Sequence, residues 1–223
     1  MSAGERALEF VRDGMTVGLG TGRAANAFVE ALGRRVAGGQ CVRGVATSER
    51  TAALARRLSI PLVTLAEAES LDLCVDGADE VDRRLDLIKG YGGALVREKI
   101  VAASARRLVI LVGPEKLVER VGERGKLPVE IVPFGHPLCA RRLEALGCKP
   151  VRRAEDADAT RPYVTDNGNW ILDCGIEPLA DPAAFEREVL AIPGVVGTGL
   201  FVGMADAVVI EWPERDEVRT RSR

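Results

Sequence analysis

The sequence predicts an α/β fold in which a Rossmann-like parallel-sheet domain carries a smaller α+β domain inserted near the C-terminus. Over the first half of the chain, short apolar runs typical of buried strands alternate with helical segments, which favours β-α-β units around a parallel sheet covered on both faces. From about residue 122 this alternation gives way to a strand, a helix and a hairpin. We therefore expect a Rossmann-like domain of residues 1–122 plus 200–223 and a small α+β domain of residues 123–199.

The first half contains strand-like runs separated by helical segments. The expected strands are MTVGLG (15–20), CVRGVA (41–46), IPLVTL (60–65), LDLCVDG (71–77), LDLIKG (85–90) and LVILVG (108–113). After the first run, Phe28, Val29 and Leu32 recur at helical spacing. Ser48 is well placed as the N-cap of a helix in SERTAALARRL, and another helix is expected in ALVREKIVAASARRL.

The second half predicts a different order of elements. The expected strands are LPVEIVPFG (127–135), GVVGTGLFVG (194–203) and DAVVIEW (206–212), with a helix in PLCARRLEALG (137–147). A hairpin is expected in YVTDNGNWILDC (163–174), where Asn167-Gly168 suits a tight turn with positive φ. A further helix, DPAAFEREVLAI, is capped by Asp181 with Pro182 in its first turn.

The composition is that of an ordinary globular protein: of 223 residues, 47% are hydrophobic and 4% are aromatic. No apolar run is long enough to cross a bilayer, and the N-terminal segment carries charges in a helical pattern unlike a secretory signal. The formal net charge of −2 gives no electrostatic reason to expect nucleic acid. We expect neither membrane nor nucleic acid as a partner, and we interpret the basic end RTRSR (219–223) as a frayed, solvated tail.

Five cysteines and one histidine limit the disulfide and metal chemistry open to the chain. The cysteines form no C-x-x-C pair, their number is odd, and three stand in apolar strand-like runs. We therefore expect reduced, mostly buried thiols in a cytoplasmic protein. The lone His136 cannot build a histidine metal site, and its place before Pro137 at an expected helix start favours a structural role. No metal site is expected.

A glycine-rich turn, GLGTGRAANAF (18–28), joins the first expected strand to the first helix. Backbone N–H groups at such a junction face outward, and the helix dipole favours an anion there. Gly20, Gly22 and Ala25 match the G-x-G-x-x-A pattern of dinucleotide-binding proteins. The next strand, however, ends in Thr-Ser (47–48), where that pattern requires a ribose-binding acid. A smaller phosphate ester is therefore favoured over a dinucleotide, and a plain tight turn is the structural alternative.

The run DLCVDGADEVD (72–82) delivers several acids to the end of an expected buried strand. Asp76 falls at the carboxyl end of that strand, where ligands bind in open α/β sheets, and Gly77 lets a ligand approach the backbone. Taken alone, DGADE is more typical of a polar turn, because turns favour Asp and Gly. A ligand-binding or catalytic site is the alternative.

The run LIKGYGGALVREKI (87–100) favours a functional site over a polar turn for the acidic run. Lys89 stands on a glycine-rich loop, where it can neutralise an oxyanion, and Glu98 stands in the first turns of a helix, where the dipole keeps it ionised and available as a base. A surface helix with a Glu-Lys face is the alternative for any single residue. Because glycine-rich or acidic loops follow three expected strands, we expect these loops to converge on one crevice.

Five motifs together make the chain resemble a known family. DGADEVD, KGYGGALVREKIVA, PVEIVPFG, VTDNGNWILD and IPGVVGTGLFVG occur in this order, and the chain resembles ribose-5-phosphate isomerase of the A type from about Val11 to Ile210. The resemblance implies interconversion of ribose 5-phosphate and ribulose 5-phosphate through an enediol(ate), in the non-oxidative pentose phosphate pathway, without a metal or organic cofactor. It implies a small sugar phosphate as ligand, and we expect a homodimer or homotetramer.

The resemblance also implies roles for individual residues. Glu98 is the base that removes the proton from C2 and returns it to C1. Asp76 and Asp79 bind sugar hydroxyls, with Asp76 assisting ring opening, and Lys89 stabilises negative charge on the enediolate oxygens. Implied substrate-binding residues are Thr21, Gly22, Arg23, Ala24, Asp76, Gly77, Ala78, Asp79, Lys89, Gly90, Tyr91, Gly92 and Lys116.

The sequence departs from the family pattern at its phosphate loop. The family typically has G-T-G-S-T, with two hydroxyls, where this chain has Gly-Thr-Gly-Arg-Ala (20–24), and it has Lys-Gly-Gly-Gly where this chain has Lys-Gly-Tyr-Gly (89–92). An isomerase for a different aldose phosphate is therefore an alternative. A sugar-phosphate-sensing module of the same fold is another, although only about a dozen residues precede the first strand, too few for a helix-turn-helix. A dinucleotide or coenzyme A enzyme is a third.

Overall fold

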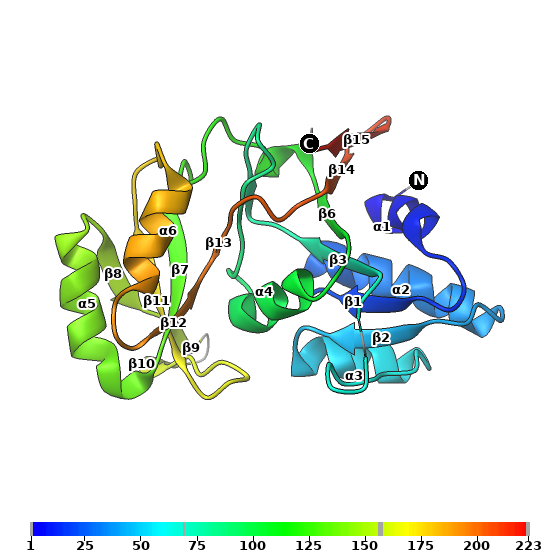
Figure 1. Ribbon diagram of the computed structural model, residues 1–223, viewed down its shortest axis with the longest axis horizontal. Helices are drawn as coiled ribbons and strands as arrows, with labels where there is room; N and C mark the ends of the chain where they lie inside the picture. The colour runs from blue at the N-terminus through cyan, green and yellow to red at the C-terminus, as the bar shows by residue number, and fades with distance from the viewer. Residues whose placement is uncertain (1, 69, 156–157, 222–223) are drawn as a thin grey trace. The chain divides into compact units, whose positions relative to one another are not determined.

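The structure is a computed structural model that describes residues 2–68, 70–155 and 158–221. The chain forms two compact units, whose helices and strands are labelled in Figure 1. Unit 1 comprises Met1–Ala78, Arg97–Leu117 and Gly203–Arg223, and unit 2 comprises Asp79–Val96 and Val118–Val202. Each unit has its own sheet and its own hydrophobic core.

Unit 1 is built on a six-stranded sheet with the strand order β15-β14-β6-β3-β1-β2. The parallel strands are β1 (Thr16–Leu19), β2 (Arg43–Ala46), β3 (Leu73–Gly77), β6 (Leu108–Val112) and β14 (Ala207–Glu211). Only β15 (Asp216–Thr220) pairs antiparallel, with β14. This sheet confirms the predicted α/β class.

Helices cover both faces of the unit 1 sheet. They are α1 (Ala3–Ala7), α2 (Arg23–Ala37), α3 (Glu49–Arg57) and α4 (Leu95–Ala103). Val17 of β1 lies in one core cluster with Phe28 and Leu32 of α2. The next residue, Gly18, faces the other way: a Cβ added there would lie 2.6 Å from Cγ1 of Val101 in α4. Because successive strand residues alternate between faces, α2 and α4 cover opposite faces, as expected.

Side chains cap two of the expected helices. The Ser48 hydroxyl accepts a hydrogen bond from the Thr51 N–H at 3.1 Å and so begins α3. The Asp181 carboxylate accepts one from the Ala184 N–H at 2.9 Å and begins α6 (Pro182–Leu190) with proline in the first turn. Both caps are those predicted, because short polar side chains satisfy N–H groups that lack partners within the helix.

Unit 2 centres on an antiparallel sheet with the order β12-β7-β11-β8. Its strands are β7 (Lys126–Ile131), β8 (Lys149–Arg152), β11 (Trp170–Gly175) and β12 (Val195–Thr198). Val129 of β7 shares a core cluster with Leu143 of α5 (His136–Ala145) and Val189 of α6. Two short sheets complete the unit: β4 (Glu80–Val81), β5 (Leu87–Ile88) and β13 (Leu200–Phe201), and the pair β9 (Ala154–Glu155) and β10 (Asp158–Pro162).

The expected hairpin at residues 163–174 is present as a turn rather than as a ladder. Gly168 has φ +77°, and its N–H donates to the Thr165 carbonyl at 2.9 Å. The strands on either side of the turn meet only at one bridge, Val164 to Trp170. The strand β11 finds its longer partners in β7 and β8 instead, because these strands complete the buried sheet.

The compact units differ from the expected domain ranges mainly at residues 79–96, which lie in unit 2 rather than with the parallel sheet. Backbone hydrogen bonds explain the difference. Strand β5 pairs with both β4 and β13, and the Lys89 N–H donates to the Gly199 carbonyl at 2.8 Å. This segment is therefore tied to the second half of the chain by a sheet that the polar sequence around it does not predict.

Two sequence-based expectations are wrong. The basic end is not simply a frayed tail, because β15 extends to Thr220 and the Arg221 N–H donates to the Asp206 carbonyl at 3.0 Å. Residues 222 and 223 lie outside the described residues. The run expected as a strand at 60–65 makes one isolated bridge beside the edge strand β2, Gly44 to Leu62, because Pro61 has no N–H with which to extend the ladder.

All five cysteines are free, and four of them, all except Cys41, are buried. The Cys139, Cys148 and Cys174 side chains belong to the unit 2 core. No helix in the described part of the chain combines the length and apolar character needed to span a membrane.

The core of unit 1 gives a first prediction. Leu32 is fully buried in α2, so Leu32→Ala leaves a cavity and should lower the free energy of unfolding by about 2–5 kcal/mol. Urea denaturation followed by circular dichroism measures this change. The matched control is Leu65→Ala, which removes the same atoms from a side chain that is 37% exposed in the same unit and should change stability by only about 0.5 kcal/mol. Equal losses in the two variants would contradict the assignment of the core.

Candidate active site

The carboxyl ends of four parallel strands in unit 1 carry most of the expected ligand-binding residues. Segment 21–24 follows β1, residues 47–48 follow β2, residues 76–78 end and follow β3, and Lys116 stands in a short 3-10 helix after β6. Because parallel strands end at the same edge of a sheet, these segments share one edge of unit 1.

Asp76 is the centre of this edge. Its side chain is only 1% exposed, and its Oδ1 accepts hydrogen bonds from the Thr21 N–H at 3.1 Å and the Gly77 N–H at 2.7 Å. The close approach depends on Gly20, because a Cβ there would lie 2.3 Å from Asp76 Oδ1. The expected meeting of the first two loops is thus present in unit 1, and it is made by backbone donors and one carboxylate.

A cluster of buried hydroxyl groups supports the same loop. Thr21 Oγ1 lies 2.8 Å from both Thr47 Oγ1 and Ser48 Oγ and 3.1 Å from Thr51 Oγ1. Thr51 Oγ1 in turn donates to the Gly20 carbonyl at 3.0 Å. The sequence indicates Ser48 only as a helix cap and gives no sign of this cluster, since its members lie about thirty residues apart. The cluster orients Thr21 inward and leaves the loop backbone to face the edge of the sheet.

The helix α2 begins at this loop without a side-chain cap. Gly22, its N-cap, has φ +114°, and no side chain accepts from the first N–H groups of the helix. Arg23 is exposed and makes no hydrogen bond or ion pair with the described residues, and Ala24 is half-buried. Free N–H groups and the positive end of the helix dipole make this helix start suitable for an anion such as a phosphate.

Glu98 is a buried carboxylate on α4. It lies in the first turn of the helix and is 3% exposed. The neighbouring Arg97 donates to Glu49 Oε1 of α3 at 2.9 Å, which ties the two helices of unit 1 together. Its place in the first turn puts the carboxyl group near the positive end of the helix dipole, where a general base could act.

Unit 2 holds the other expected catalytic pair, Asp79 and Lys89. They flank a short antiparallel ladder, in which the Asp79 N–H donates to the Ile88 carbonyl at 2.8 Å. The Lys89 side chain is 3% exposed, and its Nζ lies 5.4 Å from the centre of the Phe201 ring. The Tyr91 N–H donates to Asp79 Oδ2 at 3.0 Å, so the lysine loop and the second aspartate meet within one unit.

Tyr91, which replaces a family glycine, packs into unit 2. Its hydroxyl donates to the Lys126 carbonyl at 3.2 Å, and Lys126 Nζ lies 4.7 Å from the centre of its ring. Burial raises the pKa of the Tyr91 phenol, and the nearby carboxylates of Glu80 and Asp79 raise it further. The phenol therefore stays protonated at neutral pH and works as a structural donor. Gly90 is buried and Gly92 is exposed.

The structure therefore brings the expected residues together in two groups. Unit 1 joins the Thr21–Ala24 loop, Asp76, Gly77 and Ala78 at the sheet edge that also carries Lys116, and it contains Glu98. Unit 2 joins Asp79, Lys89, Gly90, Tyr91 and Gly92. The convergence of all three loops on one crevice stays a prediction.

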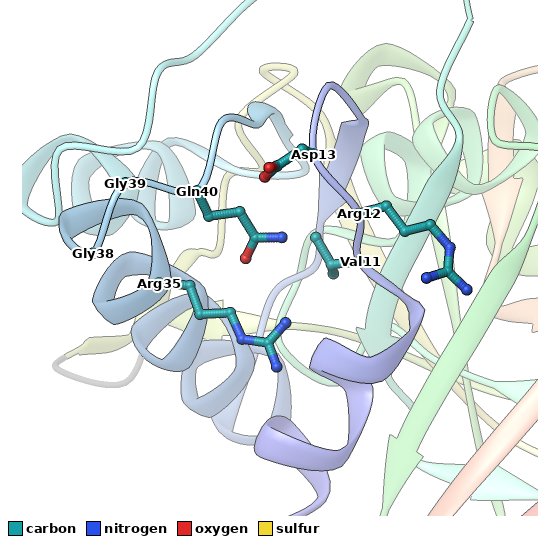
Figure 2. Close-up of a pocket in the computed structure, with 7 residues that line it drawn as sticks. All are labelled: Val11, Arg12, Asp13, Arg35, Gly38, Gly39 and Gln40. Carbon is teal, nitrogen blue, oxygen red and sulfur yellow. The ribbon is translucent and has the colours of Figure 1, made fainter.

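A pocket elsewhere in unit 1 contains none of the expected site residues. It is lined by Val11, Arg12, Asp13, Arg35, Gly38, Gly39 and Gln40. In Figure 2 the side chains of Arg35 and Gln40 point toward Val11, while Arg12 points away. Among the described residues, no group of three or more His, Cys, Asp or Glu side chains is arranged to hold a metal ion.

Comparison with known proteins gives consistent matches. The profile of the family described as ribose 5-phosphate isomerase A (phosphoriboisomerase A) matches residues 43–215. A ribose-5-phosphate isomerase A from Roseiflexus castenholzii is 56% identical over 214 residues, which cover 95% of this chain and 91% of the relative. The solved ribose 5-phosphate isomerase A of Methanocaldococcus jannaschii is 38% identical with a TM-score of 0.93, covering 98% of this chain and 96% of that one. A D-ribose-5-phosphate isomerase in complex with phospho-erythronic acid is 36% identical with a TM-score of 0.95 and the same coverage.

The contact between Gly20 and Asp76 gives a second prediction. Gly20→Ala places a methyl group where Asp76 Oδ1 lies, so it should destabilise the protein by about 1–3 kcal/mol, as overpacking does. It should also speed hydrogen exchange of the Thr21 amide, because the carboxylate must move away. The control is Gly135→Ala, where φ is −80° and the nearest atom to the new Cβ is 3.5 Å away. Unchanged Thr21 exchange in Gly20→Ala would show that the loop is not held by Asp76.

Proposed function

We propose that this chain, which belongs to the ribose 5-phosphate isomerase A family, interconverts D-ribose 5-phosphate and D-ribulose 5-phosphate. The observation that carries the proposal is sequence identity with curated isomerases over almost the whole chain. The arrangement of the two groups of polar residues supports it. Incubating the purified protein with ribose 5-phosphate and following the appearance of the ketose tests it directly, and no ketose would overturn it.

The reaction moves a hydrogen between two adjacent carbons, and we assign that step to Glu98. As a carboxylate it takes the proton from C2 of the open-chain aldose, and the electrons of the broken C–H bond form the C1–C2 double bond of an enediolate. A proton passes from the C2 hydroxyl to O1, and the same carboxyl returns its proton to C1 as the C2 carbonyl forms, which gives the ketose. The burial of Glu98 supports this role, because a base shielded from water keeps the abstracted proton from exchanging away.

Lys89 is assigned to the oxygens on which negative charge develops. It is as buried as Glu98, and a cation in a site of low dielectric stabilises an oxyanion more strongly than one in water does. Asp79, held by the Tyr91 N–H, is assigned to binding a sugar hydroxyl.

Asp76 is assigned to the hydroxyls near the ring oxygen and to ring opening. Ring opening needs a proton to leave the C1 hydroxyl while one reaches the ring oxygen, and a fixed carboxyl group can assist that transfer. The two backbone donors on Oδ1 support this role, since they hold the carboxylate in one orientation. The proposed phosphate ligands are the Thr21–Ala24 loop at the start of α2 and Lys116.

The ligand of one relative suggests a second probe. Phospho-erythronic acid joins a phosphate to a planar, negatively charged carboxylate, so it resembles an enediolate phosphate in shape and charge. We expect this chain to bind it through the same residues. Its binding can be measured without turnover, which makes it useful for inactive variants.

We further propose that the protein is cytoplasmic and forms a homodimer or homotetramer. Five free cysteines suit a reducing compartment. Unit 2 exposes large apolar side chains, among them Phe134 at 98%, Val151 at 66% and Val164 at 51%, which supports burial against another copy. Sedimentation velocity measures the assembly, and a particle with the mass of a single chain at all concentrations would contradict it.

Replacing the base gives a third prediction. Glu98→Gln keeps the size of the side chain but cannot accept the C2 proton, so kcat should fall by about 10²–10⁴-fold. Binding of phospho-erythronic acid, followed by calorimetry, should remain. The control is Glu144→Gln, an exposed carboxylate on α5, which should turn over at the wild-type rate. A Glu98→Gln variant that kept more than about a tenth of the rate would remove Glu98 from this role.

The altered phosphate loop gives a fourth prediction. We expect Arg23 to replace the hydroxyls that the family has at this turn, because its planar guanidinium can bind two phosphate oxygens. Arg23→Ala should therefore raise KM by roughly 10- to 150-fold, equivalent to the loss of about 1.5–3 kcal/mol for a hydrogen bond to a charged group, with kcat little changed.

The control for Arg23 is Arg57→Ala, which removes an exposed arginine from the last turn of α3. Arg23→Ser combined with Ala24→Thr restores the family pattern and should recover part of the lost affinity. An unchanged KM in Arg23→Ala at low salt, where charge interactions are least screened, would mean that backbone amides and Lys116 suffice.

A further inference from the structure

We propose that Arg153 is a positioning residue for the isomerisation: it holds the loop of residues 89–92 so that Lys89 and Asp79 meet the reacting oxygens. The inference rests on the proposed function and adds to it a residue that no motif indicates. Arg153 belongs to the polar run VRRAEDAD (151–158), which resembles an ordinary solvated surface segment.

The Arg153 guanidinium makes four hydrogen bonds in unit 2. Its Nε and one terminal nitrogen donate to the two carboxylate oxygens of Asp173, at 2.9 and 2.5 Å. Its other terminal nitrogen donates to the carbonyls of Gly90 and Tyr91, both at 3.1 Å. The side chain is 11% exposed, so these bonds are largely shielded from water.

The charge of this buried guanidinium is balanced locally. Asp173 on β11 accepts the bidentate pair and also lies 3.2 Å from Lys126 Nζ. The backbone of Arg153 is fixed as well, since its N–H donates to the Ile171 carbonyl at 2.8 Å and its carbonyl accepts from the Tyr163 N–H at 2.9 Å. The guanidinium is thus bound to Asp173 on one side and to the carbonyls of the 89–92 loop on the other.

The two carbonyls that Arg153 binds lie next to both expected catalytic side chains of unit 2. Gly90 follows Lys89 directly in the chain, and the Tyr91 residue that offers its carbonyl to Arg153 offers its N–H to Asp79 Oδ2. A shift of the guanidinium would therefore move the lysine backbone and release the donor that orients Asp79.

Tyr163 packs against the other end of the same loop. Gly93 has φ +86°, and a Cβ there would lie 2.2 Å from the Tyr163 hydroxyl oxygen, so the aromatic side chain leaves no space for one. The Tyr163 ring also lies 5.8 Å from the Arg153 guanidinium carbon. The loop is therefore clamped by two side chains from one segment, with Arg153 making the hydrogen bonds.

Only arginine suits this position. Its planar fork carries donors that point in two directions at once, toward a carboxylate and toward two carbonyls, whereas the ammonium of lysine is a point charge on a flexible stem. Arg153→Lys keeps the charge beside Asp173, and with it most of the folded stability, but it cannot keep all four bonds. The conservative variant therefore separates positioning from charge balance.

The experiment compares Arg153→Lys with Arg152→Lys, the neighbouring arginine, which donates to the carbonyl of Thr160 at 3.2 Å and lies over the Trp170 ring. We expect Arg153→Lys to lower kcat by about 10- to 100-fold, as a misplacement of about 1 Å does, and Arg152→Lys to behave as wild type. Asp173→Asn, which loosens the guanidinium from the far side, should show the same kind of loss. The double variant should lose less than the product of the two single losses, because both act through one contact.

Ligand binding provides the readout that a purely structural role would not produce. Arg153→Lys should weaken phospho-erythronic acid, whose carboxylate depends on Lys89 and Asp79, while competitive inhibition by inorganic phosphate stays within about 2-fold, because phosphate binds the separate loop of unit 1. Wild-type kcat in Arg153→Lys, or equal weakening of both ligands with a fall in melting temperature, would overturn the inference. Failure of the wild-type protein to form ketose would instead overturn the proposed function.

Discussion

A buried carboxylate, Asp76, is the constraint on which the candidate ligand-binding edge of unit 1 depends. A charge withdrawn from water must be matched by hydrogen-bond donors, and here those donors are backbone N–H groups from the turn after β1 and from its own turn after β3. The need to satisfy one carboxylate therefore fixes the relative position of two loops. Gly20 permits this arrangement, and the hydroxyl cluster around Thr21 keeps the first loop from turning away.

The parts of the fold that could be predicted are those encoded by local pattern. Alternating apolar runs and helical segments indicate the parallel sheet, and Ser48 and Asp181 mark helix starts by their own hydrogen bonds. Strand β15 was not predicted because its sequence, DEVRT, carries three charges and is typical of a solvent-exposed segment. The pairing of β5 with β13 escaped because it joins short segments about 110 residues apart, a distance at which local pattern carries no information.

The candidate site also contains residues that local sequence pattern indicates and one residue that it does not. The acids and the lysine proposed for the site were indicated by dense motifs that contain glycine. Arg153 could not, because its carbonyl partners lie 62 and 63 residues away and its own segment has no distinguishing pattern. The residues proposed to bind the substrate are concentrated in a few loops, whereas the residue proposed to hold one of those loops comes from a distant segment that the fold brings beside it.

Strand β15 also has a consequence for the behaviour of the protein in concentrated solution. It pairs with β14, whose Ala207, Val208, Val209 and Ile210 are completely buried, and it carries three charged residues, Asp216, Glu217 and Arg219. An apolar strand left open at a sheet edge is a template for pairing with other molecules, and charges along the outermost strand discourage such pairing. The polar segment β15 therefore protects the protein from aggregation. Its loss would leave the apolar strand β14 as an unpaired edge of the sheet.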